Sequence, residues 1–229
     1  MIQFDHVAKQ YPGTGAALSD ISFTLERGQM AFLTGHSGAG KSTLLKLIAL
    51  IERPTRGRVL FDGRNVSQLS KRHVPHLRRQ IGVIFQDHRL LEDQRVFDNV
   101  ALPLVIAGVQ YREIKRRVRA ALDKVDLLDK ERAYPPMLSG GEQQRVGIAR
   151  AIIAKPAVLL ADEPTGNLDP KLSAELMRFF VNLNELGMTV LVATHDVDLI
   201  ATFNKPRWAL SQGGLVHDQD PNQTPNQTP

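Results

Sequence analysis

A glycine-rich stretch between a predicted strand and a predicted helix constrains the fold of this chain more than any other feature. It reads Gly35-His36-Ser37-Gly38-Ala39-Gly40-Lys41-Ser42-Thr43, after the apolar run 30–34 and before the helix-like run 44–48. Its glycines let successive backbone N–H groups turn toward one anion, and the helix that follows adds the positive end of its dipole. Strand, loop and helix together predict a P-loop that binds the phosphates of a nucleoside triphosphate.

Two side chains of this loop have predicted roles. Lys41 is placed to reach the outer phosphates as a point charge, and the hydroxyl of Ser42 is placed to ligate Mg²⁺. The alternative is a surface loop of glycine and serine that contains a lysine by chance. The agreement of strand, loop and helix disfavours that alternative.

Length and composition bound the class of protein. A chain of 229 residues with 42% hydrophobic and 23% charged residues suits one α/β domain, or one domain with a smaller insert. It contains no cysteine, which excludes a disulfide framework and a thiolate metal site. The opening residues alternate like a strand, and no apolar run approaches the roughly 20 residues that cross a bilayer. We therefore expect a cytosolic protein whose membrane work passes through a partner.

The net charge of +5 permits contact with an acidic surface. Basic residues gather at 71–73, at 78–79 and between Arg112 and Arg119, where most of them share one helical face. A solvated helix face is the favoured interpretation, and a lipid or nucleic-acid site is the alternative. At the other end, residues 219–229 carry a repeated Asn-Gln-Thr-Pro and are predicted to be disordered.

The pattern of strands and helices predicts an α/β fold in which a P-loop NTPase core with a mostly parallel sheet carries two additions. The first is an N-terminal antiparallel β subdomain, predicted from strands at 2–10, 17–26 and 58–61. The second is a helical insert at about 87–138, with breaks expected at Pro103 and Gly108. We take residues 1–218 as a single nucleotide-binding domain.

Polar side chains follow three apolar strands of the predicted core. Gln86 follows the run 81–85, Asp162 and Glu163 follow 157–161, and His195 follows 189–193 with one residue between. Ligands gather at the carboxyl ends of parallel strands, so these side chains are expected at one edge of the sheet. Asp162 is predicted to hold Mg²⁺, and Glu163 to accept a proton from the attacking water as general base.

A second glycine pair opens a later predicted helix. In Ser139-Gly140-Gly141-Glu142, Ser139 is placed as an N-cap and the glycines bare backbone N–H groups. Because this stretch has no lysine, it supplies half of a phosphate site. Asp169 ends a tight loop before Pro170, which is set to open a helix. Tyr11, at the end of the first strand, is placed either to stack on an adenine base or to pack against its turn.

Taken in order, these motifs resemble the nucleotide-binding subunit of an ABC ATPase over nearly the whole chain. The motifs that carry the resemblance are 35–43, Gln86, 138–144, 159–164, 167–169 and His195. The resemblance implies the ABC ATPase fold and hydrolysis of ATP with Mg²⁺. It also implies a head-to-tail homodimer in the ATP-bound state.

The resemblance further implies roles for single residues. Residues 35–43 bind the phosphates, with Lys41 also counted as catalytic, while Ser139, Gly140, Gly141, Glu142 and Asp169 act on the nucleotide of the other subunit. His195 holds the γ-phosphate and the attacking water. Gln86 ligates the metal and links it to the helical insert. Tyr11 stacks on the adenine.

Within the family, the stretches 30–40, 78–88 and 141–150 are similar to the cell-division branch. That similarity implies a permease-like integral membrane partner, FtsX, and control of peptidoglycan hydrolases outside the membrane. It places the chain at the cytoplasmic face of the bacterial inner membrane, near division-ring proteins and without direct contact to nucleic acid. Leu50 departs from the pattern, because relatives often have glycine there.

Two other functions remain open from the sequence. The ATPase of a lipoprotein-release or efflux transporter shares much of the same pattern. A DNA-repair or chromosome-organising ATPase would suit the basic charge, but such proteins usually split their motifs with a coiled coil or a zinc insert. The segment between Lys41 and Ser139 has no long heptad run and no cysteine, which disfavours this last class.

Overall fold

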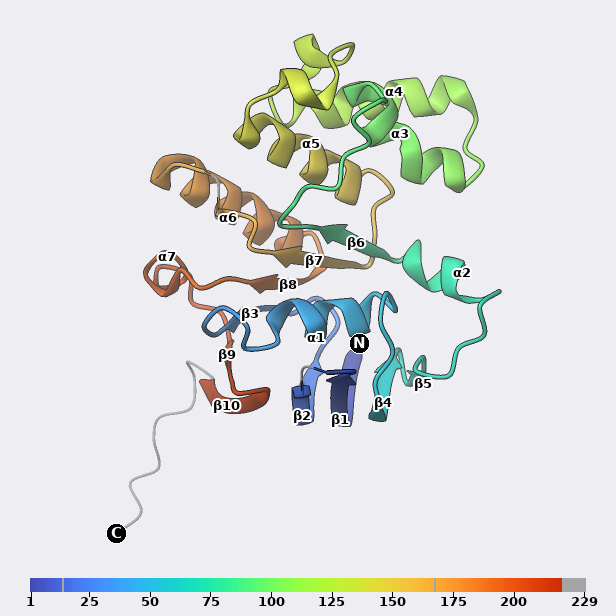
Figure 1. The fold of residues 1–229 in the computed structure, drawn as a ribbon. Coiled ribbons are helices and arrows are strands. Elements are labelled where there is room, and N and C mark those ends of the chain that lie inside the picture. The colour runs from blue at the N-terminus through green and yellow to red at the C-terminus, as the bar shows by residue number, and fades with distance from the viewer. Residues whose placement is uncertain (14, 167, 220–229) are drawn as a thin grey trace.

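The computed structural model describes residues 1–13, 15–166 and 168–219, and it arranges them as two sheets with helices between and around them (Figure 1). The predicted disorder of 219–229 therefore falls almost entirely outside the described residues. The strands are β1 Ile2–Tyr11, β2 Gly15–Leu25, β3 Met30–Thr34, β4 Arg56–Phe61, β5 Arg64–Asn65, β6 Ile81–Ile84, β7 Val158–Asp162, β8 Thr189–Ala193, β9 Arg207–Ser211 and β10 Gly214–Gln219. The helices are α1 Lys41–Ile48, α2 Val74–Arg78, α3 Val96–Ile106, α4 Tyr111–Asp123, α5 Gly140–Ile152, α6 Pro170–Glu185 and α7 Val197–Ala201, with 3₁₀ turns at Leu128–Lys130 and Pro135–Met137.

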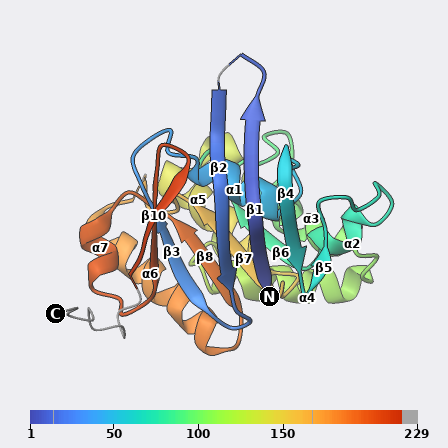
Figure 2. The same cartoon turned by 90° about the horizontal axis from the view of Figure 1, so that it is seen from below.

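The larger sheet carries the predicted core. Its strand order is β10-β9-β3-β8-β7-β6, and all neighbours are parallel except β9 and β10, which form a C-terminal hairpin. The smaller sheet has the order β2-β1-β4-β5 and is antiparallel throughout. Figure 2 shows β2, β1 and β4 lying across the face of the larger sheet. The predicted mostly parallel sheet and N-terminal antiparallel subdomain are both confirmed.

Period-two alternation sends the side chains of each central strand to two different cores. On β3, Ala31 and Leu33 pack with α1 and the antiparallel sheet, whereas Met30 and Phe32 pack with α5 and α6 on the opposite face. Strands buried on both faces read as continuous apolar runs, which is why they stood out in the sequence. Helix α1, which follows the P-loop, is thereby held between the two sheets.

The helical part forms a third core at the end remote from the antiparallel sheet (Figure 1). Val100 and Leu104 of α3, with Val118 of α4, are buried in it. Val146 and Ala149 of α5 belong to the same cluster, so this core reaches past residue 138 into the helix that Ser139 opens. Among the described residues, no helix has both the length and the apolar character needed to span a bilayer.

Local backbone geometry corrects one prediction. Helix α3 continues through Pro103, so the break predicted there is wrong, whereas Gly108, at φ +74°, does end it. Proline removes one helical hydrogen bond, but Val100 and Leu104 on either side of it are buried and keep the helix in place. Leu50, where relatives often have glycine, has φ +51°, a left-handed conformation just past the end of α1 that glycine adopts without strain.

Candidate active site

The predicted P-loop leaves the carboxyl end of β3 at the centre of the sheet and turns into α1 at Lys41. Gly40 is the N-cap of α1 and has φ +107°. The first N–H groups of a helix have no acceptor within it, so those of α1 point out of the helix end toward the loop. Backbone donors and the helix dipole thus converge on the space that the loop encloses, which is the geometry an anion needs.

Two of the loop glycines are required by their surroundings. A Cβ on Gly35 would lie 2.4 Å from the backbone oxygen of Leu210, and one on Gly40 would lie 2.6 Å from that of Ala17. Both contacts are with backbone atoms, which cannot move aside as a flexible side chain can, and both residues have positive φ. The loop therefore packs tightly against neighbouring strands, and this packing fixes its shape.

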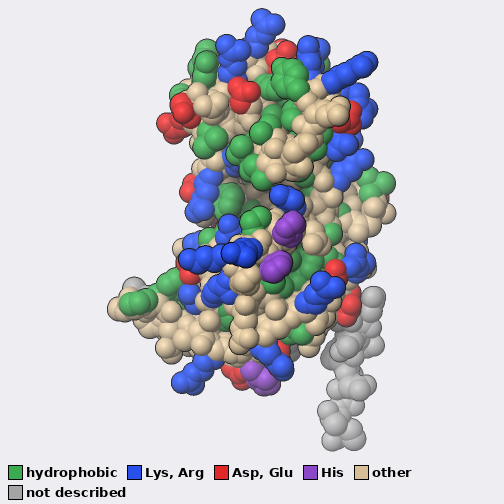
Figure 3. Space-filling model, turned by 90° about the vertical axis from the view of Figure 1, so that its right-hand side faces the viewer, with side chains coloured by type: hydrophobic (Ala, Val, Ile, Leu, Met, Phe, Trp, Pro, Cys, Tyr) green, Lys and Arg blue, Asp and Glu red, His purple; other side chains and the backbone are tan. Residues whose placement is uncertain are grey.

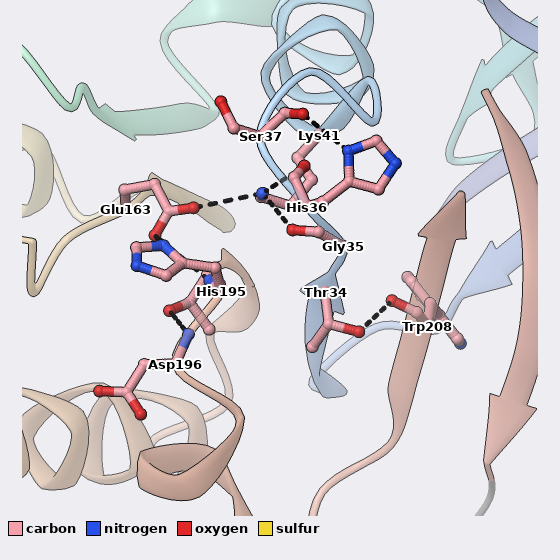
Figure 4. Close-up of polar contacts among 10 residues, drawn as sticks. Thr34, Gly35, His36, Ser37, Lys41, Glu163, His195, Asp196 and Trp208 are labelled. Carbon is pink, nitrogen blue, oxygen red and sulfur yellow. Dashed lines mark hydrogen bonds and ion pairs between the residues drawn. The ribbon is translucent and has the colours of Figure 1, made fainter. Parts of the chain in front are cut away.

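Lys41 and Glu163 meet at the mouth of the loop (Figure 4). The ammonium of Lys41 donates to the backbone oxygen of Gly35 at 2.6 Å and lies 3.3 Å from Glu163 Oε1. The other carboxylate oxygen, Oε2, lies 2.9 Å from Nδ1 of His195. The Lys41 side chain is 8% exposed and that of Glu163 11%, so both charges are well shielded from water. Three predicted site residues are therefore connected: Glu163 contacts Lys41 through one carboxylate oxygen and His195 through the other.

Asp162, Ser42 and Gln86 have the chemistry of a magnesium site. Burial raises the pKa of Asp162, and the neighbouring hydroxyl of Ser42 opposes that rise by hydrogen bonding. Within the described part of the chain, the buried Asp162 Oδ1 has no hydrogen-bond partner. A buried carboxylate oxygen without a donor is costly, and a cation is one way to satisfy it. Carboxylate, hydroxyl and amide oxygens are hard ligands of the kind that Mg²⁺ takes.

Two neighbouring cavities connect these groups. One, of about 470 Å³, is lined by residues 36–43 of the loop together with Ala17, Gln86, Glu163 and His195. The other, of about 410 Å³, is lined by Ser42, Gln86 and Asp162 together with Leu45, Lys46, Ile51, Val83, Phe85, Asp87 and Arg89. Ser42 and Gln86, two of the three predicted metal ligands, line both cavities, and Asp162 lines the second. All three strand-end groups predicted for one edge of the sheet are indeed gathered there.

The start of α5 has the capping geometry predicted for it. Ser139 Oγ accepts from the backbone N–H of Glu142 at 3.3 Å, and Glu142 Oε2 accepts from the backbone N–H of Ser139 at 2.8 Å. This capping box lowers the pKa of Glu142, chiefly through the backbone N–H of Ser139. Ser139 and Gly140 are exposed, and a Cβ on Gly141 would have space except toward Leu168, at 3.2 Å.

The loop before α6 lies beside that helix start. Asp169 caps α6 by accepting from the backbone N–H groups of Lys171 and Leu172, both at 3.0 Å, and Asp169 itself is exposed. Leu168 faces Gly141, so the two segments predicted to act on the nucleotide of another subunit are neighbours. Among the described residues, neither Ser139 nor Asp169 lines the cavities at the P-loop. Their predicted roles in trans stay predictions. Asn167, part of the same motif, lies outside the described residues.

Tyr11 is another predicted site residue that lies away from the cavities. It is half-buried at the end of β1, with the ammonium of Lys9 at 4.9 Å from its ring centroid. Within the described residues it lines neither cavity. Stacking of Tyr11 on an adenine base stays a prediction.

Arg150 is a residue that sequence reasoning missed. On α5, its guanidinium donates to the backbone oxygens of His88 at 2.5 Å and Arg89 at 2.6 Å. It therefore ties the helix that Ser139 opens to the segment that follows Gln86. The signal in the sequence was a lone charge among the apolar residues 148–152, and nothing local pointed to a partner about 60 positions earlier.

Known proteins are similar to this chain in sequence and in fold. Residues 18–166 match the family model described as ABC transporter. The cell division ATP-binding protein FtsE of Escherichia coli K12 is 60% identical over 215 residues, which cover 94% of this chain and 97% of that protein. FtsE of Bacillus subtilis 168 is 45% identical over 219 residues, covering 96% of each chain.

A solved structure agrees over almost the whole chain. It is the dimeric post-hydrolysis state of the ATP-binding cassette MJ0796 bound to ADP and Pi, with a TM-score of 0.92 and 33% identity. The match covers 98% of this chain and 100% of that one. The family model, the relatives and the shared fold lead to one conclusion: this chain belongs to the ABC transporter family, as an ATP-binding cassette that hydrolyses ATP.

Proposed function

We propose that this chain is the ATP-binding and hydrolysing subunit of an ABC complex that acts in bacterial cell division. The contact of Lys41 with Glu163 and of Glu163 with His195, at the mouth of the P-loop, carries the ATPase part of the proposal. The identity to FtsE proteins over nearly their full length supports the cell-division part.

In this proposal the P-loop amides and Lys41 bind the β- and γ-phosphates. Ser42, Asp162 and Gln86 would hold Mg²⁺, which when bound neutralises charge on the phosphate oxygens. Glu163 accepts the proton of the attacking water, because its carboxylate stands at the cavity that the loop lines. The contact with Nδ1 of His195 holds that carboxylate in one orientation, which positions the base before a water arrives.

The second half of the site comes from another copy of the chain. Ser139, Gly140, Gly141 and Glu142 would close over the γ-phosphate of the partner subunit, with Asp169 at the same interface. Ser139, Gly140 and Asp169 are exposed, and within the described residues none of the five lines the cavities at the P-loop, which supports this arrangement. A head-to-tail homodimer then encloses two ATP molecules, and hydrolysis opens it. The dimeric cassette bound to ADP and Pi is similar over its whole length.

The motion would reach a membrane partner through the helical part of the chain. Gln86 lies between the P-loop cavity and the segment that Arg150 holds to α5, so a change at the phosphates can pass to that helix. We propose FtsX as the partner, at the cytoplasmic face of the inner membrane and close to division-ring proteins. In that setting the complex controls peptidoglycan hydrolases across the membrane.

Recovery of the complex from membranes tests this function. The chain with an affinity tag is purified from detergent-solubilised membranes, with ATP and without it, and the recovered proteins are identified by mass spectrometry. We expect FtsX in both conditions from wild-type membranes. Recovery of a lipoprotein-release permease in its place would contradict the cell-division part, while ATPase activity of the purified chain tests the chemistry separately. Salt-sensitive affinity for DNA in place of any permease would favour a chromosome-organising ATPase.

A further inference from the structure

The end of α3, the start of α4 and the residues that join them, 105–111 (the α3–α4 turn), expose a group of apolar side chains. Val105 is 57% exposed, Ile106 59% and Tyr111 71%. No acidic residue occurs between Asp98 and Glu113. Contiguous exposed apolar side chains of this kind are uncommon on soluble proteins and mark surfaces that contact something else.

The packing of the two helices explains why these side chains face outward. Leu104 near the end of α3 and Ile114 near the start of α4 are buried in the helical core. Gly108, at φ +74°, reverses the chain between them, and the N–H of Val109 donates to the oxygen of Leu104 at 3.1 Å. The inward positions are thereby filled, and the residues between them project from the end of the helical pair (Figure 1).

Helix α4 adds positive charge directly beside this turn. Its 13 residues include five Lys or Arg and two Asp or Glu, a net charge of +3 in a chain whose total is +5. Arg112, Lys115, Arg116 and Arg119 lie on its exposed face, opposite the buried Ile114 and Val118. Figure 3 faces this side of the molecule, and Lys and Arg side chains lie beside exposed hydrophobic ones in its upper part.

Some of these cations have partners and some do not. Arg116 and Arg117 both pair with Glu113, and Arg119 lies 3.3 Å from Glu131. Within the described residues, Arg112 and Lys115 form no ion pair. The two cations next to the apolar turn are thus available to an external anion.

We propose that the α3–α4 turn binds a surface of anionic phospholipid. Val105, Ile106 and Tyr111 enter the boundary between headgroups and acyl chains, while Arg112 and Lys115 bind headgroup phosphates. An apolar edge with a tyrosine, flanked by basic residues, is the pattern of side chains that lie in this boundary. A projecting turn suits a lipid surface better than a groove-binding peptide, and its charge suits an anionic one. This contact does not need the membrane partner, so it goes beyond the proposed function.

Co-sedimentation of the purified wild-type chain with vesicles tests the proposal. One set of vesicles is phosphatidylcholine alone and the other is equal parts phosphatidylcholine and phosphatidylglycerol. We expect binding to the second set, weakening as salt is added, and little binding to the first. Equal binding to both sets, or binding to neither, would overturn the proposal.

Variants separate the two kinds of contact. Arg112→Gln with Lys115→Gln should weaken binding about tenfold or more, since each basic residue near an anionic surface adds about 1 kcal/mol. Ile106→Ser with Tyr111→Ser should also weaken it, by a comparable factor, with the charge unchanged. The matched control is Arg56→Gln with Arg64→Gln, two exposed arginines on the antiparallel sheet at the opposite end of the molecule.

One variant is expected to bind more strongly, and a folding defect could not produce that result. Glu113→Gln removes the partner of Arg116 and Arg117 and should strengthen binding to the anionic vesicles. ATP hydrolysis by all these variants in solution should match the wild type, because none of the changed residues lines the cavities. Loss of binding in the control pair as large as in the α4 pair would show nonspecific charge attraction and overturn the proposal. So would unchanged binding by the Ile106 and Tyr111 variant.

Discussion

At the residue scale, the site depends on how Glu163 is held. The carboxylate has a cation on one oxygen and an imidazole nitrogen on the other, at 3.3 and 2.9 Å. Its side chain is only 11% exposed, so these contacts act with little screening by water. Glu163 also has φ +46°, an uncommon value for a residue other than glycine. Backbone strain of this kind concentrates at functional positions.

Replacement of the proposed base tests its role. Glu163→Gln keeps the size and the hydrogen-bonding shape of the side chain but cannot accept a proton. We expect hydrolysis to fall about a hundredfold or more, with ATP still bound. Phosphate release and ATP binding by calorimetry measure the two effects separately. Near-normal turnover in this variant would remove Glu163 from the role of base.

Replacement of the P-loop lysine should act on binding. Lys41→Ala removes the one Lys or Arg side chain among residues 35–43. A hydrogen bond to a charged group contributes about 1.5–3 kcal/mol, so ATP affinity should drop at least about tenfold. Calorimetry measures the affinity, and Lys124→Ala, an exposed lysine in the helical part, is the control. Unchanged affinity in the Lys41 variant would argue against the whole site.

Local pattern predicted each of these residues but not their contacts. Lys41 and Glu163 stood out because each follows an apolar strand in a characteristic motif. Their ion pair joins positions 122 apart in the chain, and no spacing rule encodes such a pair. The same holds for Arg150, whose partners are backbone oxygens that any residue type would provide. Tertiary contacts of this kind need the folded chain.

At the element scale, helix α4 combines a buried apolar face with a charged exposed one. Glu113 accepts from Arg116 one turn along and from Arg117 beside it, both at 2.7 Å. These hydrogen bonds, first that of Arg116 and then that of Arg117, lower the pKa of Glu113 to about 2. Because the pKa of Glu113 is lower in the folded protein than in the unfolded chain, its ionised form stabilises the fold at pH values above the unfolded pKa. This contribution is lost as the pH falls toward about 2.

Titration of Glu113 checks this arrangement. NMR of the side-chain carboxyl should show an inflection near pH 2 in the wild type. In a variant with Arg116→Gln and Arg117→Gln the inflection should move up toward the ordinary value of 4.5, because both donors are gone. An inflection that stays in place would mean that the two arginines do not hold the carboxylate in solution.

The boundaries of helices and strands show where residue propensities alone gave a wrong prediction. Strands β3, β6, β7 and β8 of the larger sheet were predicted well because they are buried on both faces and are bounded by polar turns. Helix α3 was predicted to break at Pro103, and the structure shows that it does not. Helix propensity gives the free-energy cost of proline within a helix. It does not show that Val100 and Leu104 are buried, and their burial offsets that cost.

At the scale of the whole molecule, the two segments that we propose as halves of one nucleotide site do not share a cavity within the described residues. The P-loop lies at the cavity between β3 and α1, whereas the start of α5 is exposed beside the loop before α6. In the proposed function, head-to-tail pairing of two copies brings both segments to one nucleotide. The symmetry of such a pair produces two equal sites.

A capping residue allows this pairing to be tested without loss of fold. Ser139→Asp keeps an N-cap of about equal strength, so thermal stability should stay close to that of the wild type. The added carboxylate would face the γ-phosphate of the partner's ATP, and like charges repel. In the Glu163→Gln background, we expect the ATP-dependent dimer to be lost, as measured by light scattering. Ser139→Asn, a neutral cap, is the control and should still dimerise. A dimer that persists with aspartate would exclude Ser139 from the shared site.

The charges of Lys41 and Glu163 neutralise each other, and this contact links ATP binding to the release of the Glu163 carboxylate. A triphosphate carries more negative charge than one carboxylate, so it competes for the same ammonium. When the phosphates take Lys41, the oxygen of Glu163 that it held becomes available to water. In the proposed function, binding of ATP and release of the Glu163 carboxylate from Lys41 therefore occur together, and a subunit without ATP keeps that carboxylate paired with Lys41.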